Sequence, residues 1–470
     1  MTATLTDTRR EGMLALLSPA YRRETLTISL GLGLHAFNEY SVAPVLPVAL
    51  ADLGDLPFLP WAYALFFSGV IAGGITSSAL RAKIGARQTA LLSAVLYGLA
   101  MLLNTTAASG EQLLAGRLLQ GLADGWLAAL CYSMIPEFFA ARLIGKMIAL
   151  ETIVWAGMAV LGPSIGGIAT DLFGWRVGLG VSLPIIIAFA VTAAMIFPPT
   201  RGNVAVPMRA GHFATVLFCV AAILIMILPS AVSIGFLTPL AIPLGAVMLT
   251  LLMAHDARRD APLFPRQTFR FNNSVGLGGW VLLLITAGLS ISTVFMAYAV
   301  QAIFGVPSRV VGMVVLSMPL AWTLTAIPVG NVQSLTLQRR LFTIGPLCQM
   351  AGAALIILGL TNAHLIVVVL GQIVIGLGLG TVWGPVIAAM LAASHEADRG
   401  RVGALLPGTT TVGFVLGSGL GGWVAGQTGL FADGGPSPLS VVALWSTMIL
   451  FAIAGLFLIQ KVQPSIEDVP

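Results

Sequence analysis

The chain has 470 residues, of which 57% are hydrophobic and only 9% carry a charge, and its mean hydropathy is +0.97. Soluble domains contain about 25% charged residues, so the composition excludes a soluble globular protein and indicates one that is solvated by a lipid bilayer. The net charge of +5 does not indicate nucleic-acid binding, because the basic residues follow membrane topology and suit contact with anionic lipid headgroups.

Fourteen apolar stretches approach or exceed the roughly 20 residues that a helix needs to span a bilayer. In chain order they cover 26–50, 61–81, 88–106, 111–134, 146–170, 176–197, 213–229, 233–254, 274–302, 308–330, 341–360, 364–392, 402–427 and 439–460. The segment 213–254 contains no Lys, Arg, Asp or Glu and is interrupted by LPSAVSIG, which predicts a tight helical hairpin. A twelve-span arrangement that leaves this segment outside the membrane is the alternative.

The basic residues test this arrangement, because cytoplasmic loops of membrane proteins are enriched in Lys and Arg. With both termini in the cytoplasm, all but three of the 23 Lys and Arg residues fall in cytoplasmic segments. The exceptions are Arg117 inside a span and Arg176 and Arg309 at outer helix ends. We therefore expect a multi-pass protein of a bacterial inner (plasma) membrane with both termini cytoplasmic, and no cleaved signal peptide, since the first apolar stretch is long enough to span.

An internal repeat relates the two halves of the chain. GRLLQGLADG from Gly116 matches GQIVIGLGLG from Gly371, and VLGPSIGG from Val160 matches VLGSGLGG from Val415; both pairs differ by 255 positions. The repeat predicts two six-helix bundles, 26–197 and 273–461, between cytoplasmic segments 1–25 and 462–470. The connecting segment 198–272 holds the extra hairpin. Duplicated bundles around a midplane site are the architecture of secondary transporters that work by alternating access.

The fifth span carries VLGPSIGG, which Gly157 precedes. Its small residues and its proline are Gly157, Gly162, Pro163, Gly166 and Gly167. Small residues let two membrane helices approach closely, and a proline inside a helix removes a backbone donor and bends the helix. The stretch therefore predicts a close contact at a bent helix, with ordinary packing as the alternative reading.

Three further stretches have a similarly specific spacing. The fourth span holds Arg117, Gln120 and Gly121; the loop segment SALRAKIGAR holds Leu80, Lys83, Gly85 and Arg87; the first span holds Asn38, Glu39, Leu46 and Pro47. Together with the fifth-span stretch, these resemble motifs of the major facilitator superfamily, and within it of the fourteen-span drug:proton antiporters. Four positions depart from the pattern: in the loop motif Ser78 replaces a Gly and Ala82 replaces the acidic residue of the usual latch, and in the first span Asn38 stands in place of an Asp and Val45 in place of an Ala.

The resemblance implies an all-α integral membrane protein with the major facilitator fold, built from two six-helix bundles plus two extra central helices. It implies that the fifth-span glycines and Pro163 form an antiporter motif that seals the substrate cavity against leak. It further implies a small-molecule substrate, protons as the coupling ion and no bound cofactor. We expect a monomer.

Four ionisable side chains lie within the predicted spans: Glu39, Arg117, Asp124 and Glu151. An ionisable group in a bilayer costs roughly 3 kcal/mol or more and is by default a functional candidate. No Asp or Glu occurs between residues 261 and 395, so any carboxylate chemistry belongs to the first bundle. In the repeat, Gln372 and Leu379 stand where the first bundle has Arg117 and Asp124, so these charges are not required by the shared architecture.

Spacing suggests how these groups are used. Arg117 and Asp124 are seven residues apart and share a helix face, too far apart for an ideal i,i+4 pair, so each is expected to meet another helix or water. His35 lies four residues before Glu39, on the same face. We predict Asp124 and Glu39 as proton carriers, with Arg117 and His35 as their electrostatic partners. The alternatives are that Asp124 and His35 are satisfied structural groups and that Glu151 faces cytoplasmic water.

The sequence also offers candidates for a substrate cavity, which are Asn38, Gln120, Trp126, Tyr298 and Gln301. Packing or an interfacial position is the alternative for the tryptophans. The leading functional hypothesis is proton-coupled export of small hydrophobic or amphipathic compounds, including cationic ones. The alternative is a transporter of the same superfamily for a specific metabolite, siderophore or lipid, working by symport.

A membrane enzyme is a further alternative, and it would need a cluster of nucleophile, base or metal ligands. The five histidines are scattered, and no HExxH, nucleophile-elbow or GxxxxGK[ST] stretch occurs. Cys131, Cys219 and Cys348 lie singly in apolar stretches, which indicates core residues rather than a disulfide or metal site. We therefore expect no enzyme and no metal.

Overall fold

The computed structural model describes residues 13–198, positions 218, 221–222, 224–226, 228, 240–256 and 258, and residues 270–330, 332, 334–394 and 396–463. Within this part of the chain every regular element is helical. Long apolar runs favour helices in a bilayer because a helix satisfies all of its own backbone hydrogen bonds. The expected all-α class is confirmed.

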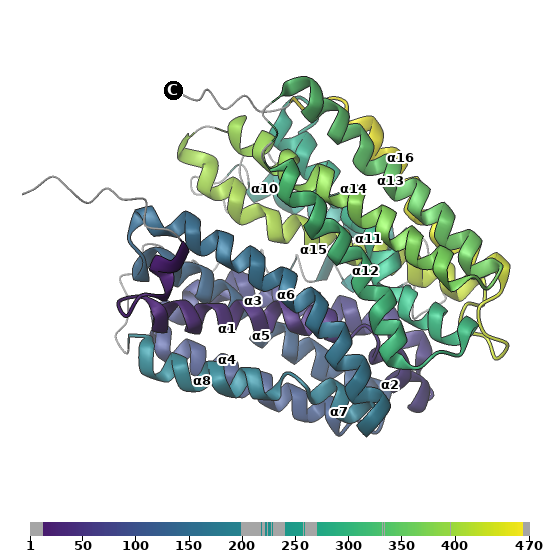
Figure 1. Ribbon diagram of the computed structural model, residues 1–470, viewed down its shortest axis with the longest axis horizontal. Coiled ribbons are helices and arrows are strands. Elements are labelled where there is room, and N and C mark those ends of the chain that lie inside the picture. Colours follow the sequence, from purple (N-terminus) through teal and green to yellow (C-terminus); the bar gives the residue numbers. More distant parts are fainter. Residues whose placement is uncertain are drawn as a thin grey trace, which may run out of the picture.

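The first bundle contains eight helices. They are α1 (Arg22–Ser41), α2 (Leu46–Asp52), α3 (Leu59–Ile84), α4 (Ala86–Thr105), α5 (Gly110–Phe138), α6 (Ala141–Phe173), α7 (Trp175–Gly180) and α8 (Leu183–Ile196). Two short 3-10 helices, η1 (Met13–Leu17) and η2 (Leu56–Phe58), lie at its edges. In Figure 1 this bundle occupies the lower left, in purple and blue.

The second bundle lies beside the first in Figure 1, in green and yellow. It consists of α11 (Ser274–Phe304), α12 (Ser308–Val329), α13 (Leu335–Thr361), α14 (Leu365–Ala392), α15 (Glu396–Gln427) and α16 (Pro438–Ile459). Of the predicted hairpin, the second helix corresponds to α10 (Ala241–Asp256), whereas most of 213–229 lies outside the described residues.

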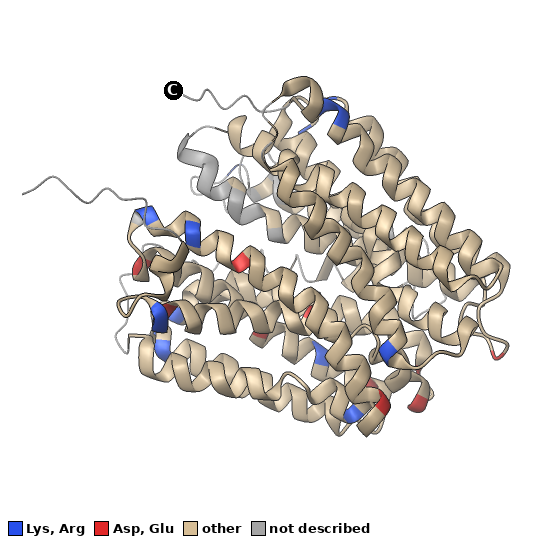
Figure 2. Ribbon diagram, in the orientation of Figure 1, with Lys and Arg blue, Asp and Glu red and all other residues tan. Residues whose placement is uncertain are grey.

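Ten helices among the described residues are long and apolar enough to cross a membrane. Two more helices of comparable length, α1 and α15, are not among these ten and pack within the bundles, against α6 and α11 respectively. In Figure 2, most of the helical length is tan, and the charged residues concentrate towards the helix ends. The structure is therefore that of a multi-pass membrane protein, while the predicted number of fourteen spans stays a prediction.

Two predicted spans are each divided into two helices. The span 26–50 breaks between α1 and α2, where Pro44 lies and Pro47 occupies the first turn of α2. The span 176–197 breaks between α7 and α8, with Pro184 in the first turn of α8. Proline lacks a backbone donor, which costs no hydrogen bond in the first turn of a helix, so Pro47 and Pro184 favour the start of a new helix at these two positions.

Connections are short, so neighbouring helices run in opposite directions. Gly85 alone joins α3 to α4 and Gly174 alone joins α6 to α7, with φ of 92° and 86°, a conformation that favours glycine. We call the end of the bundles at which α1 begins and α16 ends the terminal end. The opposite end, which holds α2, α7 and the start of α12, is the far end (Figure 1).

The sequence repeat reappears in the helices. α5 begins at Gly110 and α14 at Leu365, which differ by the same 255 positions. On α5, a Cβ at Gly121 would overlap the Phe66 carbonyl oxygen of α3, and on α14 a Cβ at Gly376 would overlap the Met318 carbonyl oxygen of α12. Equivalent glycines thus allow equivalent close helix contacts in the two bundles.

Candidate functional site

An ion pair joins α1 and α5 inside the first bundle. The Nδ1 atom of His35 lies 2.6 Å from Oδ2 of Asp124. The Asp124 side chain is fully buried and that of His35 is 14% exposed. The partner of Asp124 is therefore on another helix, as the spacing of the charges along α5 suggests. An imidazole and a carboxylate at this distance can share one proton.

Gln120 is the centre of a second group of contacts, one turn before Asp124. Its Nε2 donates to Oδ1 of Asn38 on α1 at 2.9 Å. Its Oε1 accepts from Nδ2 of Asn104 on α4 at 3.0 Å and from Nη1 of Arg117 at 2.8 Å. All four side chains are buried. Three helices, α1, α4 and α5, are therefore joined by one polar network within the bundle.

Arg117 is buried although none of its hydrogen bonds to described residues reaches a carboxylate. Its Nε donates to the Ala62 carbonyl oxygen of α3 at 3.3 Å, and its guanidinium carbon lies 4.2 Å from the centroid of the Phe66 ring. Hydrogen bonds and a cation–π contact thus take the place of an acidic partner. This explains how a charge that the sequence places in a span can be held there.

Several atoms of the network have no partner among the described residues. They are Oδ1 of Asp124, Nδ2 of Asn38 and Oδ1 of Asn104, all buried. Buried polar atoms are nearly always hydrogen-bonded, so each such exception needs an explanation. An unused carboxylate oxygen beside an imidazole can accept a proton or a donor group that enters the site.

Glu39 lies one turn beyond His35 on α1 and is partly buried. It is close enough to His35 and Asp124 to interact electrostatically with both. Within the described part of the chain, no hydrogen bond or ion pair to its carboxylate is found. The Trp155 ring of α6 contacts the His35 ring edge-on, with centroids 5.5 Å apart. The structure thus brings Glu39, His35 and Asp124 together. Arg117 instead packs against Ala62 and Phe66 of α3.

The second bundle has no comparable charges among its described helices. At the position equivalent to Arg117, the Gln372 amide oxygen accepts a hydrogen bond from Ser292 of α11 at 2.8 Å. Leu379, equivalent to Asp124, is buried. A neutral hydrogen bond therefore occupies this position in the second bundle, and charged groups occupy it in the first.

The fifth-span glycines lie where α6 meets both α1 and α12. A Cβ at Gly166 would overlap the Ser41 carbonyl oxygen of α1, and one at Gly162 would crowd the same turn. A Cβ at Gly167 would overlap the Ser308 carbonyl oxygen of α12. Gly157 differs, because a Cβ there would meet no atom within 4 Å. Close packing thus explains three of the four predicted glycines: Gly162 and Gly166 allow contact within the first bundle, and Gly167 allows contact with the second.

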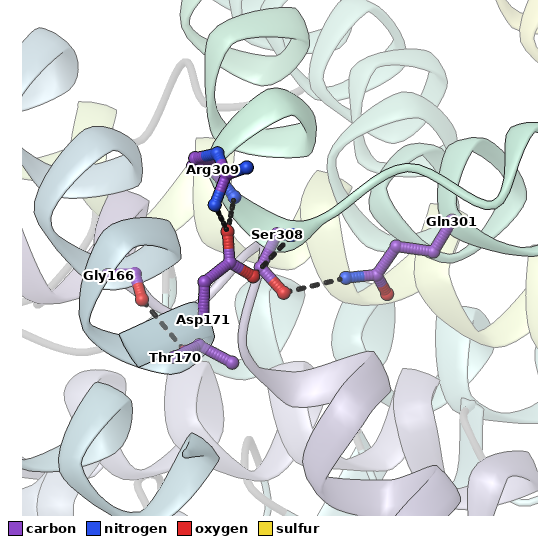
Figure 3. Close-up of polar contacts among 6 residues, drawn as sticks. All are labelled: Gly166, Thr170, Asp171, Gln301, Ser308 and Arg309. Atoms are coloured by element: carbon purple, nitrogen blue, oxygen red, sulfur yellow. Dashed lines mark hydrogen bonds and ion pairs between the residues drawn. The ribbon is translucent and has the colours of Figure 1, made fainter. Parts of the chain in front are cut away.

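A polar cluster near these glycines links the bundles at their far ends (Figure 3). The two carboxylate oxygens of Asp171, near the end of α6, accept the backbone N–H groups of Ser308 at 2.8 Å and Arg309 at 3.0 Å. Since these residues begin α12, the carboxylate caps that helix from the other bundle. Gln301 donates from Nε2 to the Pro44 carbonyl oxygen of the first bundle and to Ser308 Oγ, both at 3.3 Å.

Other predicted residues have structural contacts. Trp126 donates from Nε1 to Thr76 Oγ1 at 2.8 Å, between α5 and α3. The Tyr298 hydroxyl donates to the Leu430 carbonyl oxygen at 3.2 Å. Gln301 belongs to the far-end cluster rather than to the network around Gln120. These three residues thus join helices and loops, and the cavity role predicted for them stays a prediction.

The loop motif between α3 and α4 also contributes contacts. Arg87 donates from Nε to the Phe197 carbonyl oxygen at 2.9 Å, and Lys83 is exposed. The buried Arg81, which the motif comparison did not single out, pairs with Glu137 and donates to Ser133 Oγ on α5. A charge contact thus forms here although Ala82 replaces the acidic residue of the usual pattern.

Three functional candidates were not predicted from sequence: Asn104, Arg81 and Asp171. Each is a polar residue near the end of an apolar stretch, where exposure to water is the ordinary expectation. The alternative in which Glu151 faces water does not fit the structure, because this side chain is buried, with 3% exposure. Among the described residues, no group of three or more His, Cys, Asp or Glu side chains is placed to hold a metal ion.

Residues 28–255 match the model of the Major Facilitator Superfamily. The chain is 24% identical over 441 residues to a probable multidrug-efflux transporter of Mycobacterium tuberculosis (strain ATCC 25618 / H37Rv), covering 90% of this chain and 91% of that protein. It is 27% identical over 435 residues to the puromycin resistance protein of Streptomyces alboniger, covering 88% and 84%.

Solved structures share the fold at lower sequence identity. An auto-inhibited peptide transporter of the POT family superimposes with a TM-score of 0.67 at 14% identity, covering 95% of this chain and 99% of that chain. A D-xylose-proton symporter does so with a TM-score of 0.65 at 16% identity, covering 95% and 98%. At such identities the likeness concerns the arrangement of the two bundles and not the substrate.

Proposed function

We propose that this chain, which matches the model of the Major Facilitator Superfamily over residues 28–255 and resembles transporters over most of its length, exports small hydrophobic or amphipathic compounds in exchange for protons. The export would cross the bacterial plasma membrane. The observation that carries the proposal is the His35–Asp124 pair, buried in one bundle and absent from its repeat. Names of relatives that refer to multidrug efflux and puromycin resistance support the choice of substrates.

The pair supports proton coupling for an electrostatic reason. A buried carboxylate that loses its shared proton leaves a charge in a low-dielectric environment, which is costly unless a cation or water replaces the proton. A cationic substrate can provide that charge. Glu39 and the Trp155 ring, both beside His35, offer a second carboxylate and an aromatic surface for such a compound.

The contacts between the bundles support alternating access. In this structure Asp171 caps α12 at the far end, and the Phe67 and Phe414 rings, whose centroids are 4.5 Å apart, join α3 to α15 further along these helices. We propose fourteen spans with both termini in the cytoplasm, so that the far end faces outward. The conformation is then closed to the outside, and export requires the far-end contacts to break.

The test is transport by purified protein in vesicles with an imposed pH gradient. With ethidium and puromycin as substrates, we expect the pH gradient to drive substrate movement opposite to the protons. Asp124→Asn should reduce this movement by about tenfold or more, because a proton-transfer group is lost. Glu111→Gln is the matched control, since Glu111 is exposed in the first turn of α5. Movement of substrate in the direction of the protons, or unchanged transport by the Asp124 variant, contradicts the proposal.

A further inference from the structure

A second buried carboxylate lies outside the network described above. Glu151 of α6 is 3% exposed, and its Oε1 accepts a hydrogen bond from the Ser29 hydroxyl of α1 at 2.7 Å. Its Oε2 is also buried and has no hydrogen-bond partner among the described residues. A buried polar atom without a partner costs roughly 1–3 kcal/mol. One carboxylate oxygen is therefore bound, and the other is available.

Among the described residues, no positively charged side chain is found in contact with the Glu151 carboxylate. From α1 it faces Ser29, and from α5 the titratable Cys131 and Tyr132 interact with it electrostatically. No ion pair to the Glu151 carboxylate is found within the described residues. In the ionised form the carboxylate would be stabilised by a single hydroxyl, whereas a proton on Oε2 would remove the buried charge.

Glu151 and Asp124 are neighbouring sites. The Cys131 side chain interacts electrostatically with both carboxylates. Its sulfur atom lies against Gly31 of α1, where an added Cβ would lie 2.5 Å from Sγ. The partners on α1, Ser29 and His35, are six residues apart, which corresponds to about 9 Å along a helix. Since α1 begins at the terminal end, the Glu151 site is nearer to that end than the ion pair.

We propose that Glu151, held by Ser29, is a second proton-binding site that passes protons between the His35–Asp124 pair and the water at the terminal end. The inference rests on the proposed proton exchange. The proton binds to the Glu151 carboxylate when the pair releases it, and it leaves towards the terminal end, with the Ser29 hydroxyl stabilising the carboxylate that remains. The gap between the sites along α1 is left for water or a side-chain movement to bridge.

The proton site itself is tested by infrared difference spectroscopy of the purified protein during a pH titration. We expect a carboxylic-acid band that disappears in Glu151→Gln and whose titration midpoint moves in Ser29→Ala. Glu111→Gln should leave the band unchanged, because that carboxylate is exposed. A Glu151→Gln protein whose carboxylic-acid absorption equals that of the natural protein at every pH would overturn the inference. Glu151→Asp, which keeps a carboxylate, covers the case in which Glu151→Gln does not fold.

Transport separates this inference from the proposed function. In vesicles, Glu151→Gln should slow pH-driven export by about tenfold, the loss expected for a proton-transfer group, and retain exchange of labelled for unlabelled substrate without a pH gradient. Equal rates of pH-driven export by Glu151→Gln and the natural protein would refute the role of Glu151 and leave the proposed function intact. Absence of any pH-driven transport by the natural protein would refute the proposed function instead.

Discussion

Removal of the Asp171 carboxylate should loosen the contact between the bundles at the far end. The carboxylate accepts two backbone N–H groups of α12 and is only 12% exposed, so water screens these bonds little. Loss of an N-cap costs about 0.5–2 kcal/mol, and hydrogen bonds to a charged group contribute about 1.5–3 kcal/mol. For Asp171→Ala we expect the closed far end to lose about 2–3 kcal/mol relative to the open one.

This loss corresponds to a roughly 30- to 150-fold shift of the equilibrium towards the open far end. Asp171→Asn should have a smaller effect, because its amide oxygen still accepts one N–H group. The Arg309 guanidinium should contribute little, since it lies 3.5 Å from the carboxylate and is 54% exposed. The order of effects is therefore Asp171→Ala, then Asp171→Asn, then Arg309→Gln.

The shift is measured as a distance between two spin labels, one on each bundle. Ala51 of α2 and Ala302 of α11 are exposed near the far end and suit labelling as cysteines in a background without the native cysteines. We expect one short distance in the natural protein and an added longer one in Asp171→Ala. Asp52→Asn is the control, because Asp52 bonds to Trp175 within the first bundle. An unchanged distance distribution in Asp171→Ala would refute the reasoning.

Two further predictions concern packing and the buried arginine. Gly166→Ala should destabilise the protein by about 1–3 kcal/mol through overlap with α1, whereas Gly157→Ala should be neutral or slightly stabilising, because no atom lies within 4 Å of a Cβ there. Thermal unfolding in detergent measures both, and equal losses would contradict the packing argument. Arg117→Lys should lower pH-driven export by about tenfold. The planar guanidinium bonds to the Ala62 carbonyl oxygen and to Gln120 while it lies over the Phe66 ring, and a lysine ammonium cannot make these contacts together. Export at the natural rate would show that the planar guanidinium is not needed.

The helices could be predicted well from the sequence because bilayer thickness fixes their length. The predicted spans 274–302 and 308–330 correspond to Ser274–Phe304 and Ser308–Val329. The first span was predicted as one helix because its apolar character is continuous, although Pro44 and Pro47 divide it. Hydropathy reports solvation and not backbone hydrogen bonding, so it does not detect such a break. The family resemblance, drawn from short motifs, is confirmed by the comparisons.

The candidate site could be predicted only as a set of residues and not as pairs. The sequence indicates that Asp124 is costly in a membrane, but its contact with His35 spans 89 positions and depends on how α1 packs against α5. Asp171 was missed because a single acidic residue at the end of a span is ordinarily interfacial. Its partner is the backbone of residues 137 and 138 positions further on, which has no sequence signature.

The contacts at the far end determine which residues there tolerate substitution. Three of the hydrogen bonds described between the bundles join a side chain on one bundle to the backbone of the other: Asp171 accepts two N–H groups, and Gln301 donates to the Pro44 carbonyl. A backbone group survives almost every substitution of its own residue. The closed state can therefore be lost by a single change at Asp171 or Gln301, whereas the residues that face them are free to vary.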